Sequence, residues 1–422
     1  MNFSRKILPN GLRLITVPMK DNPTVTVMVL VEAGSKYETK KINGVSHFFE
    51  HMCFKGTTKR PKAVDIVREL DGVGSQYNAF TAQEMTGYYA KSDRKHFGKI
   101  LDVVSDIYLH STFPEAELEK EKGVIIEEIR MYQDMPTRHI HDVLMELLYG
   151  DQPAGWDIAG SEATVKSTTR ESMVAYREKH YVSGATSVIV AGNADETEVA
   201  SKVKQVFANM PSGRKHQKTA VKEAQKEPNI AIKYKETDQV HLALALRTFN
   251  LYSDDMPAMR VASTILGGGM SSRLFQKMRD ELGICYYVGA AHESFTDHGF
   301  LEITAGVPAK RLPEAVAALI GELKLIKEKP IDETELARVK EYLIGNMYLS
   351  LESSDSLAEF YGYQEIVKKP LLLPKEIEEK IRKVKSQDIK RLVDKYIVDS
   401  GLNLALIGPL KSKKELEKLL HL

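Results

Sequence analysis

The chain contains two copies of one sequence pattern, separated by about half of its length. Residues 113–122 (FPEAELEKEK) are similar to residues 331–340 (IDETELARVK) at an offset of 218. Each copy also closes with an apolar run that ends in glycine, at residues 187–192 and 403–408, an offset of 216. Repeats of this length exceed the units of about 20–50 residues that build solenoids. We therefore expect two copies of one domain.

A polar segment separates the two copies. It begins with the run Pro-Ser-Gly near residue 212 and continues to Pro228, a composition typical of a linker. We expect one domain at residues 1–212, a linker at residues 213–228 and a second domain at residues 229–422.

Each copy combines strand patterns with helix patterns. Residues 24–31 and 240–246 are apolar runs that predict a strand early in each copy. Between these strands and the closing strands lie long patterns typical of helices, such as residues 97–109 and 312–319. The fold class should therefore be α+β. Each of the two homologous domains should contain a mostly antiparallel sheet with helices on one face.

The first copy contains the motif His47-Phe48-Phe49-Glu50-His51. On a helix, the two histidines are one turn apart on the same face, where two imidazoles can bind one metal ion. Glu50 is near enough to reach a water on that metal without being a ligand. The motif thus supplies two ligands and a general base, although a match of this length can also arise by chance on an amphipathic helix.

A catalytic zinc site needs a third protein ligand and an open position. Two glutamates share one helical stripe with apolar residues, and this stripe consists of Leu118, Glu121, Ile125, Glu128 and Tyr132. A buried carboxylate is costly unless it is paired or binds metal. We assign Glu128 as the third ligand, and Glu121 as a carboxylate that supports a ligand or as an alternative ligand. The competing interpretation places both glutamates in salt bridges at the edge of the stripe.

These residues resemble the inverzincin metallopeptidases, which include pitrilysin, insulin-degrading enzyme and mitochondrial processing peptidase. His47, Glu50 and His51 are followed by the run Phe-Lys-Gly-Thr, and Glu128 follows at the spacing of that family's ligand glutamate. The resemblance covers the whole chain, whose length is similar to that of the processing-peptidase and small bacterial protease branch. It implies a roll-like topology for each half.

The resemblance also implies roles for residues outside the metal motif. The run GSQYNAFT is similar to a strand on which substrate backbone docks, so Asn78 and Ala79 should bind substrate. Arg279 and Tyr286 are similar to an arginine–tyrosine pair that holds substrate and stabilises the oxyanion. Tyr287 is an alternative for the tyrosine.

The second copy lacks the metal chemistry. The positions that correspond to Glu121 and Glu128 are Val339 and Asn346, and residues 258–262 contain no histidine. We expect one zinc ion per chain, bound by the first half. The second half should have a different task, as the resemblance implies.

The motif and the resemblance together imply a zinc metalloendopeptidase that hydrolyses peptides or unfolded segments bound in extended form. Zinc lowers the pKa of its bound water toward about 7, and Glu50 takes the proton as general base. Glu84 lies just beyond the docking strand. It either supports a histidine ligand or forms a simple salt bridge.

The composition excludes some other classes of protein. A chain of 422 residues with 43% hydrophobic residues can build two or more cores. A net charge of +1 gives no reason to expect nucleic acid or an anionic membrane as a partner. Two cysteines do not indicate a disulfide framework. With no signal peptide and no membrane span in the pattern, we expect a cytoplasmic location.

The metal motif and the arginine–tyrosine pair occur in one chain, so the resemblance favours a homodimer. The metal half of one subunit would face the second half of its partner. The alternative is a non-catalytic scaffold subunit of a larger complex, as some relatives in respiratory complexes are. Those relatives have typically lost the zinc motif, which this chain keeps.

Overall fold

The apolar strands of each repeat assemble into a separate β-sheet. The structure is a computed structural model that describes residues 2–422. Within these residues, the first sheet has the strand order β1-β2-β6-β3-β5-β4 and the second has the order β7-β11-β8-β10-β9. In the first sheet only β2 and β6 are parallel, and in the second only β7 and β11 are parallel. The α+β class and the mostly antiparallel sheets are thus confirmed.

The strands have closely similar lengths in the two halves. Those of the first sheet are β1 (Ser4–Ile7), β2 (Arg13–Pro18), β3 (Thr24–Val31), β4 (Gln76–Thr81), β5 (Thr86–Asp93) and β6 (Thr186–Gly192). Those of the second sheet are β7 (Asn229–Tyr234), β8 (Val240–Arg247), β9 (Val288–Ser294), β10 (Gly299–Val307) and β11 (Leu402–Gly408).

The helices make up most of the remaining chain. Those of the first half are α1 (Val45–Cys53), α2 (Ala63–Asp71), α3 (Phe97–His110), α4 (Glu115–Asp134), α5 (Pro136–Tyr149), α6 (Glu162–Ser167), α7 (Arg170–His180) and α8 (Glu196–Val206). Those of the second half are α9 (Met256–Gly267), α10 (Arg273–Phe275), α11 (Leu312–Glu328), α12 (Glu333–Ser350), α13 (Ser354–Ile366), α14 (Pro374–Lys383), α15 (Ser386–Tyr396) and α16 (Lys414–Glu417). None of the helices in residues 2–422 has the length and apolar character needed to cross a membrane.

The chain forms two compact units, and each takes a helix from the other half of the sequence. The first unit consists of the residues up to Arg130 with residues 156–219 and 348–374, and the second of residues 131–155, 220–347 and 375–422. The segment that contains α13 therefore belongs to the first unit, and the segment that contains α5 belongs to the second. These units differ from the contiguous division at residues 213–228, which stays a prediction about where one repeat ends and the next begins.

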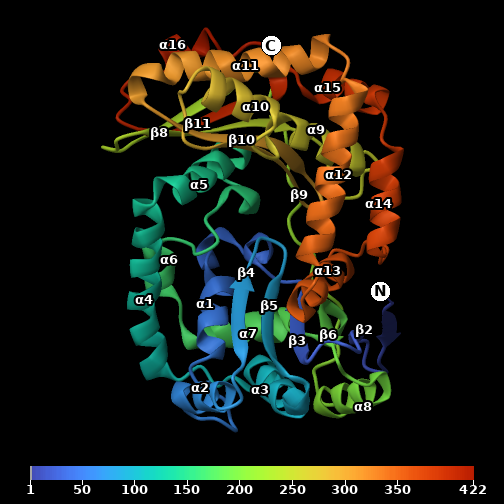
Figure 1. The fold of residues 1–422 in the computed structure, drawn as a ribbon. Helices are drawn as coiled ribbons and strands as arrows, with labels where there is room; N and C mark the ends of the chain where they lie inside the picture. Colours follow the sequence, from blue (N-terminus) through green and yellow to red (C-terminus); the bar gives the residue numbers. More distant parts are fainter. Residues whose placement is uncertain (1) are drawn as a thin grey trace. The chain divides into compact units, whose positions relative to one another are not determined.

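The exchanged helices cover the second face of each sheet. In the first unit α13 packs on β3 and β6, and in the second unit α5 packs on β8 and β11 (Figure 1). The two helices begin at Pro136 and Ser354, which differ by the repeat offset of 218. Each sheet thus has the expected helices of its own repeat on one face and a helix of the other repeat on the opposite face.

Burial on both faces explains why the central strands are almost continuously apolar. In β3, Val25, Val27 and Val29 enter the main core of the first unit. Thr26 faces the other way, and its hydroxyl lies 2.8 Å from that of Ser354 at the start of α13. In β8, the leucines enter the main core of the second unit, while Ala243 and the next alanine pack against α5.

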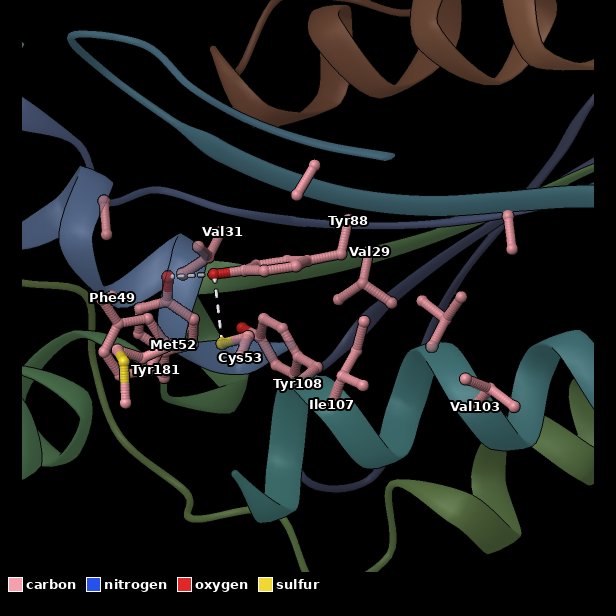
Figure 2. Close-up of a cluster of buried hydrophobic side chains, with 14 of the residues drawn as sticks. Val29, Val31, Phe49, Met52, Cys53, Tyr88, Val103, Ile107, Tyr108 and Tyr181 are labelled. Carbon is pink, nitrogen blue, oxygen red and sulfur yellow. Dashed lines mark hydrogen bonds between the residues drawn. The ribbon is translucent and has the colours of Figure 1, made fainter. Parts of the chain in front are cut away.

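The buried face of α1 fixes this helix in the first unit. Phe49, Met52 and Cys53 point into a cluster that also contains Tyr108 of α3 and Tyr88 of β5 (Figure 2). The thiol of Cys53 donates a hydrogen bond to the Tyr88 hydroxyl at 3.5 Å. Burial raises the pKa of this thiol to about 12, so it is protonated and unreactive near neutral pH. The opposite face of α1 carries the metal motif.

The close approach of α13 to the first sheet predicts a large effect of Gly362→Ala. A Cβ at this position would lie 2.7 Å from Leu30 and 3.2 Å from Ile189. We expect the substitution to lower the free energy of unfolding by about 1–3 kcal/mol, because these side chains must shift. Gly345→Ala in α12 is the matched control, since a Cβ there meets no atom within 4 Å. It should raise stability by roughly 0.5–1 kcal/mol. Chemical denaturation measures both, and equal effects of the two would contradict the close packing.

Candidate metal centre

The start of α1 is held by a buried carboxylate. Glu38 accepts hydrogen bonds from the backbone N–H groups of Gly44 at 2.7 Å and Ser46 at 2.8 Å. A carboxylate at the N-terminus of a helix satisfies free N–H groups and interacts favourably with the helix dipole. Gly44 has a φ of +94°, and a Cβ there would lie 2.5 Å from the carbonyl oxygen of Ala159. Glycine is therefore required where the chain enters the helix.

Three side chains of the first unit converge at the metal motif. The Nε2 atoms of His47 and His51 lie 3.3 Å apart. Oε2 of Glu128 in α4 lies 3.7 Å from Nε2 of His47 and 3.4 Å from Nε2 of His51. Within residues 2–422, these three residues are the only group of histidine, cysteine or carboxylate ligands close enough to share a metal ion.

These distances fit a zinc ion. A tetrahedral site with bonds of about 2.0–2.1 Å places its ligand atoms about 3.3–3.4 Å apart. Two imidazoles and one carboxylate also form a typical donor set for catalytic zinc, with the fourth position open. Two of the three separations, 3.3 and 3.4 Å, match this value, and the third is longer at 3.7 Å. The assignment of His47, His51 and Glu128 as the ligand set stays a prediction.

Glu121 lies behind the histidines rather than among the ligands. Its Oε1 accepts a hydrogen bond from Nδ1 of His51 at 2.9 Å, and its Oε2 pairs with Lys55 at 2.6 Å. A carboxylate on the far nitrogen fixes the tautomer and orientation of a ligand histidine and makes it more basic. Burial favours a raised pKa for Glu121, but the hydrogen bonds from His51 and Lys55 hold the pKa below its usual value. This geometry favours the supporting role of Glu121 over the alternative in which it is a ligand, and that role stays a prediction.

The carboxylates around His51 attract positive charge. Burial alone would lower the pKa of this histidine, but hydrogen bonds to Glu121 and Glu128 and the charge of Glu50 raise the pKa to about 9. Either a proton or a divalent cation can satisfy these carboxylates. Because a metal ligand must be a neutral imidazole, metal binding would displace that proton.

Glu50 is oriented by the neighbouring strand β4. The hydroxyl of Thr81 donates a hydrogen bond to Oε2 of Glu50 at 2.6 Å. Burial raises the pKa of Glu50, while this hydrogen bond opposes the shift. A half-buried carboxylate with a raised pKa is a better proton acceptor near neutral pH than an exposed one. Thr81 was not singled out by the sequence, although its place in the run GSQYNAFT put it two residues from Ala79.

Asn78 and Ala79 lie on β4 at the edge of the first sheet. In the described part of the chain, β4 pairs with β5 on one side and with no strand on the other. The N–H of Ala79 donates a hydrogen bond to Oδ1 of Asn78 at 2.9 Å. An open edge beside a candidate active site can accept an extended peptide as an additional strand.

The other predicted site residues have defined partners. Glu84 forms ion pairs with Lys36 and Lys218, as the salt-bridge alternative states, and its support of a histidine stays a prediction. In the second unit, the guanidinium of Arg279 lies 4.5 Å from the centre of the Tyr286 ring and donates a hydrogen bond to the Tyr286 carbonyl at 2.6 Å.

The two candidate tyrosines have different surroundings. Tyr286 is 76% exposed. The hydroxyl of Tyr287, in contrast, lies 2.9 Å from Nδ1 of His241. This arrangement favours Tyr286 as the partner of Arg279, and the catalytic role of the pair stays a prediction.

Comparison with known proteins finds matches along most of the chain. Residues 13–162 match the model of the insulinase family, peptidase family M16, and residues 167–343 match the model of the M16 inactive domain. A Bacillus subtilis protein called uncharacterized zinc protease YmxG is 35% identical over 412 residues, which cover 96% of this chain and 98% of that protein. A Rickettsia felis protein called an uncharacterized zinc protease is 32% identical and covers 97% and 98%.

Solved structures share the fold. The crystal structure of a protease from Helicobacter pylori has a TM-score of 0.90 at 22% identity and covers 97% of this chain and 99% of that one. A structure titled peptidase M16 inactive domain, from Pseudomonas fluorescens, has a TM-score of 0.88 at 19% identity and covers 98% and 100%. At these identities, the likeness supports the arrangement of two homologous α+β domains.

The contact between Glu121 and His51 predicts the effect of Glu121→Gln on metal affinity. The glutamine keeps the size of the side chain but removes the charge that makes His51 more basic. We expect zinc affinity to fall about 10–100-fold, as measured by competition with a chromogenic chelator. Glu127→Gln is the control, because Glu127 lies on the same helix with its side chain 71% exposed. Unchanged affinity in Glu121→Gln, or an equal loss in both variants, would contradict the supporting role.

The burial of Glu38 predicts a pH dependence of stability in the metal-free protein. Burial, opposed by the hydrogen bonds of Ser46 and Asn43, raises the pKa of Glu38 to about 7 from the ordinary 4.5. Between these values the unfolded chain releases the proton while the folded chain retains it. Stability should therefore fall by an amount on the order of 3 kcal/mol as pH rises through this window, and level off above it. Glu38→Gln should remove this part of the slope in denaturant titrations. An unchanged slope would show that Glu38 has an ordinary pKa.

Proposed function

Because the chain belongs to the insulinase family of peptidases, M16, we propose that it is a zinc-dependent endopeptidase. Its substrates are peptides or unfolded segments that bind in extended form. The observation that carries the proposal is the convergence of His47, His51 and Glu128 at distances that suit zinc, with Glu50 beside them. The names of its relatives as zinc proteases support the same activity.

The chemistry divides between the metal and the carboxylate of Glu50. When bound, zinc supplies a Lewis acid that polarises the substrate carbonyl and lowers the pKa of water. Glu50 accepts a proton as water attacks the carbonyl carbon, and it then donates that proton to the leaving amine nitrogen. The hydrogen bond from Thr81 holds one oxygen of the carboxylate, so the other oxygen is left for the transfer. Proton transfer by a positioned group contributes about 10²–10⁴-fold to such a reaction.

Substrate orientation is assigned to the edge of β4. An extended segment that pairs with this edge would place its backbone next to Asn78 and Ala79. Because Thr81 belongs to the same strand and donates a hydrogen bond to Glu50, the docking strand also positions the general base. Arg279 and Tyr286 are proposed to hold substrate and stabilise the oxyanion. Main-chain pairing of this kind suits unfolded segments, whose backbone groups are free.

The alternative of a non-catalytic scaffold subunit predicts a fold without a working site. The intact ligand geometry and the support of His51 by Glu121 argue against it. Zinc analysis of the purified chain distinguishes the two. We expect about one zinc ion per chain, whereas a folded chain that binds no zinc would be a scaffold.

The proposed roles of Glu50 and Glu128 predict that substitution of each residue removes a different property, either cleavage alone or zinc binding together with cleavage. Glu50→Gln should retain zinc and the fold while peptide cleavage falls by about 10²-fold or more, because the proton acceptor is lost. Glu128→Gln should lose zinc and activity together. Cleavage is measured by mass spectrometry on a random peptide library, with zinc content determined on the same samples. Near-normal cleavage by Glu50→Gln would show that another group is the base.

We also propose that the enzyme is a homodimer in which the metal half of one subunit works with the second half of its partner. The support is the presence of the zinc motif and of the Arg279–Tyr286 pair in one chain. A mixture of the inactive variants Glu50→Gln and Arg279→Ala should then recover part of the activity, since one of the two sites in a mixed dimer has both intact halves. No recovery, together with a monomer mass of 47.4 kDa in sedimentation, would exclude the dimer.

A further inference from the structure

The strand β7 occupies the same place in the second sheet that β2 occupies in the first. In the first sheet, Arg13 of β2 pairs in parallel with Ser187 of β6. In the second sheet, Asn229 of β7 pairs in parallel with Asn403 of β11. Asn229 follows Arg13, and Asn403 follows Ser187, by the same offset of 216. The strands β2 and β7 are therefore equivalent in the two repeats and pair with their neighbours in the same register. Their outer edges can therefore be compared directly.

These two outer edges differ in what covers them. In the first sheet β1 pairs antiparallel with β2, from Ser4 opposite Thr16 to Ile7 opposite Arg13. In the second sheet, no strand of residues 2–422 pairs with the outer edge of β7. The first sheet thus shows that this edge can accept an antiparallel strand, and in the second sheet the edge remains open.

The segment that would correspond to β1 is held elsewhere. At the offset of 216 it would comprise residues 220–223, which form no strand. The N–H of Val221 donates to Oδ2 of Asp297 at 3.1 Å. The side-chain amide of Gln152 binds both the N–H and the carbonyl of Lys222, at 2.8 and 3.1 Å. These bonds keep the segment from closing the edge of its own sheet.

A surface groove lies beside the open strand. Its lining includes Ile230, Ile232 and Tyr234, which alternate along β7 and therefore share a face. The rest of its lining consists of residues 410–414 and Glu417. Tyr234 is 51% exposed and the two isoleucines are half-buried. Open backbone groups beside partly exposed apolar side chains are the features that bind an added strand.

The groove is positively charged. Its lining includes Lys411, Lys413 and Lys414 against one acid, Glu417. Lys413 pairs with Glu417 at 3.4 Å, whereas Lys411 and Lys414 form no salt bridge with any residue in 2–422. Lysines near an open edge oppose pairing between two identical chains. The charge therefore disfavours a second copy of this chain as the occupant and favours an acidic one.

We propose that the outer edge of β7 is a docking site for an extended acidic segment of a partner protein. The segment would add to β7 as an antiparallel strand, in the way that β1 adds to β2. Alternate side chains of the segment would contact Ile230, Ile232 and Tyr234, and its carboxylates would pair with Lys411 and Lys414. This site is separate from the metal centre and does not depend on catalysis.

The test uses the full chain with Glu50→Gln, so that a peptide probe is not cleaved. The probe is a fluorescein-labelled peptide of alternating glutamate and valine, about ten residues long to match a typical strand. Its affinity is measured by fluorescence anisotropy. The double substitution Lys411→Glu and Lys414→Glu should weaken binding at least about tenfold, because two attractive charges become repulsive. A peptide of alternating lysine and valine should bind the starting protein more weakly than the glutamate peptide does. It should bind the double variant more tightly than it binds the starting protein.

The matched control is Lys375→Glu with Lys380→Glu on α14, which makes the same change of charge outside the groove at exposed positions. It should leave binding within about twofold of the starting protein, because these two lysines do not line the groove. Equal weakening by both double variants, or equal affinity for the two peptides, would overturn the proposal.

Strand addition has its own signature in the peptide backbone. Only one edge of an added strand bonds to β7, so N-methylation of one set of alternate residues should abolish binding. Methylation of the other set should leave it nearly unchanged. If neither pattern of methylation weakens binding, or if both do so equally, the segment does not dock as a strand.

Discussion

Each sheet of this protein must bury both of its faces, and the rest of the structure follows from that constraint. The central strands are apolar on both faces of the sheet. Helices of the same repeat lie on one face only, so the apolar side chains of the other face need a second cover to be buried from water. The repeats solve the problem reciprocally, with α13 on the first sheet and α5 on the second. Since α5 directly follows α4, the exchanged segment begins at the end of the helix that carries Glu121 and Glu128. The candidate metal-site residues of α4 and the helix that covers the second sheet, α5, therefore lie in one continuous stretch of chain.

The candidate metal centre contains several carboxylates, and hydrogen-bond donors from the surrounding elements hold each of them in place. Glu38 holds the start of α1, and Glu121 holds His51 from behind while Lys55 balances its charge. Thr81 fixes Glu50 from the neighbouring strand. Each of these groups touches a residue of the motif or the start of its helix. A site that must place a proton acceptor beside a divalent cation needs such support, because unsupported carboxylates would repel one another.

Much of this arrangement was predictable from local sequence patterns. The spacing of His47 and His51 requires only a helix, and the stripe that carries Glu121 and Glu128 requires only helical periodicity. The repeat offset predicted two homologous domains. The exchange of α5 and α13 was not predictable, because periodicity shows that a helix has an apolar face but not which sheet covers it. Glu38 was missed because its partners include the backbone N–H groups of Gly44 and Ser46, which no side-chain pattern reveals.

The exchange of helices also affects the order in which the protein can be assembled during synthesis. The last strand of the first sheet, β6, ends at Gly192, while α13 begins at Ser354. A ribosome must therefore add 161 further residues before the first sheet can be covered on its second face. In that interval an apolar surface is exposed to water and to other nascent chains. The helix α5 is in the opposite situation, since it is made before the sheet on which it packs. The first half of the chain thus completes its folding only after α13, which ends at Ile366, has been translated.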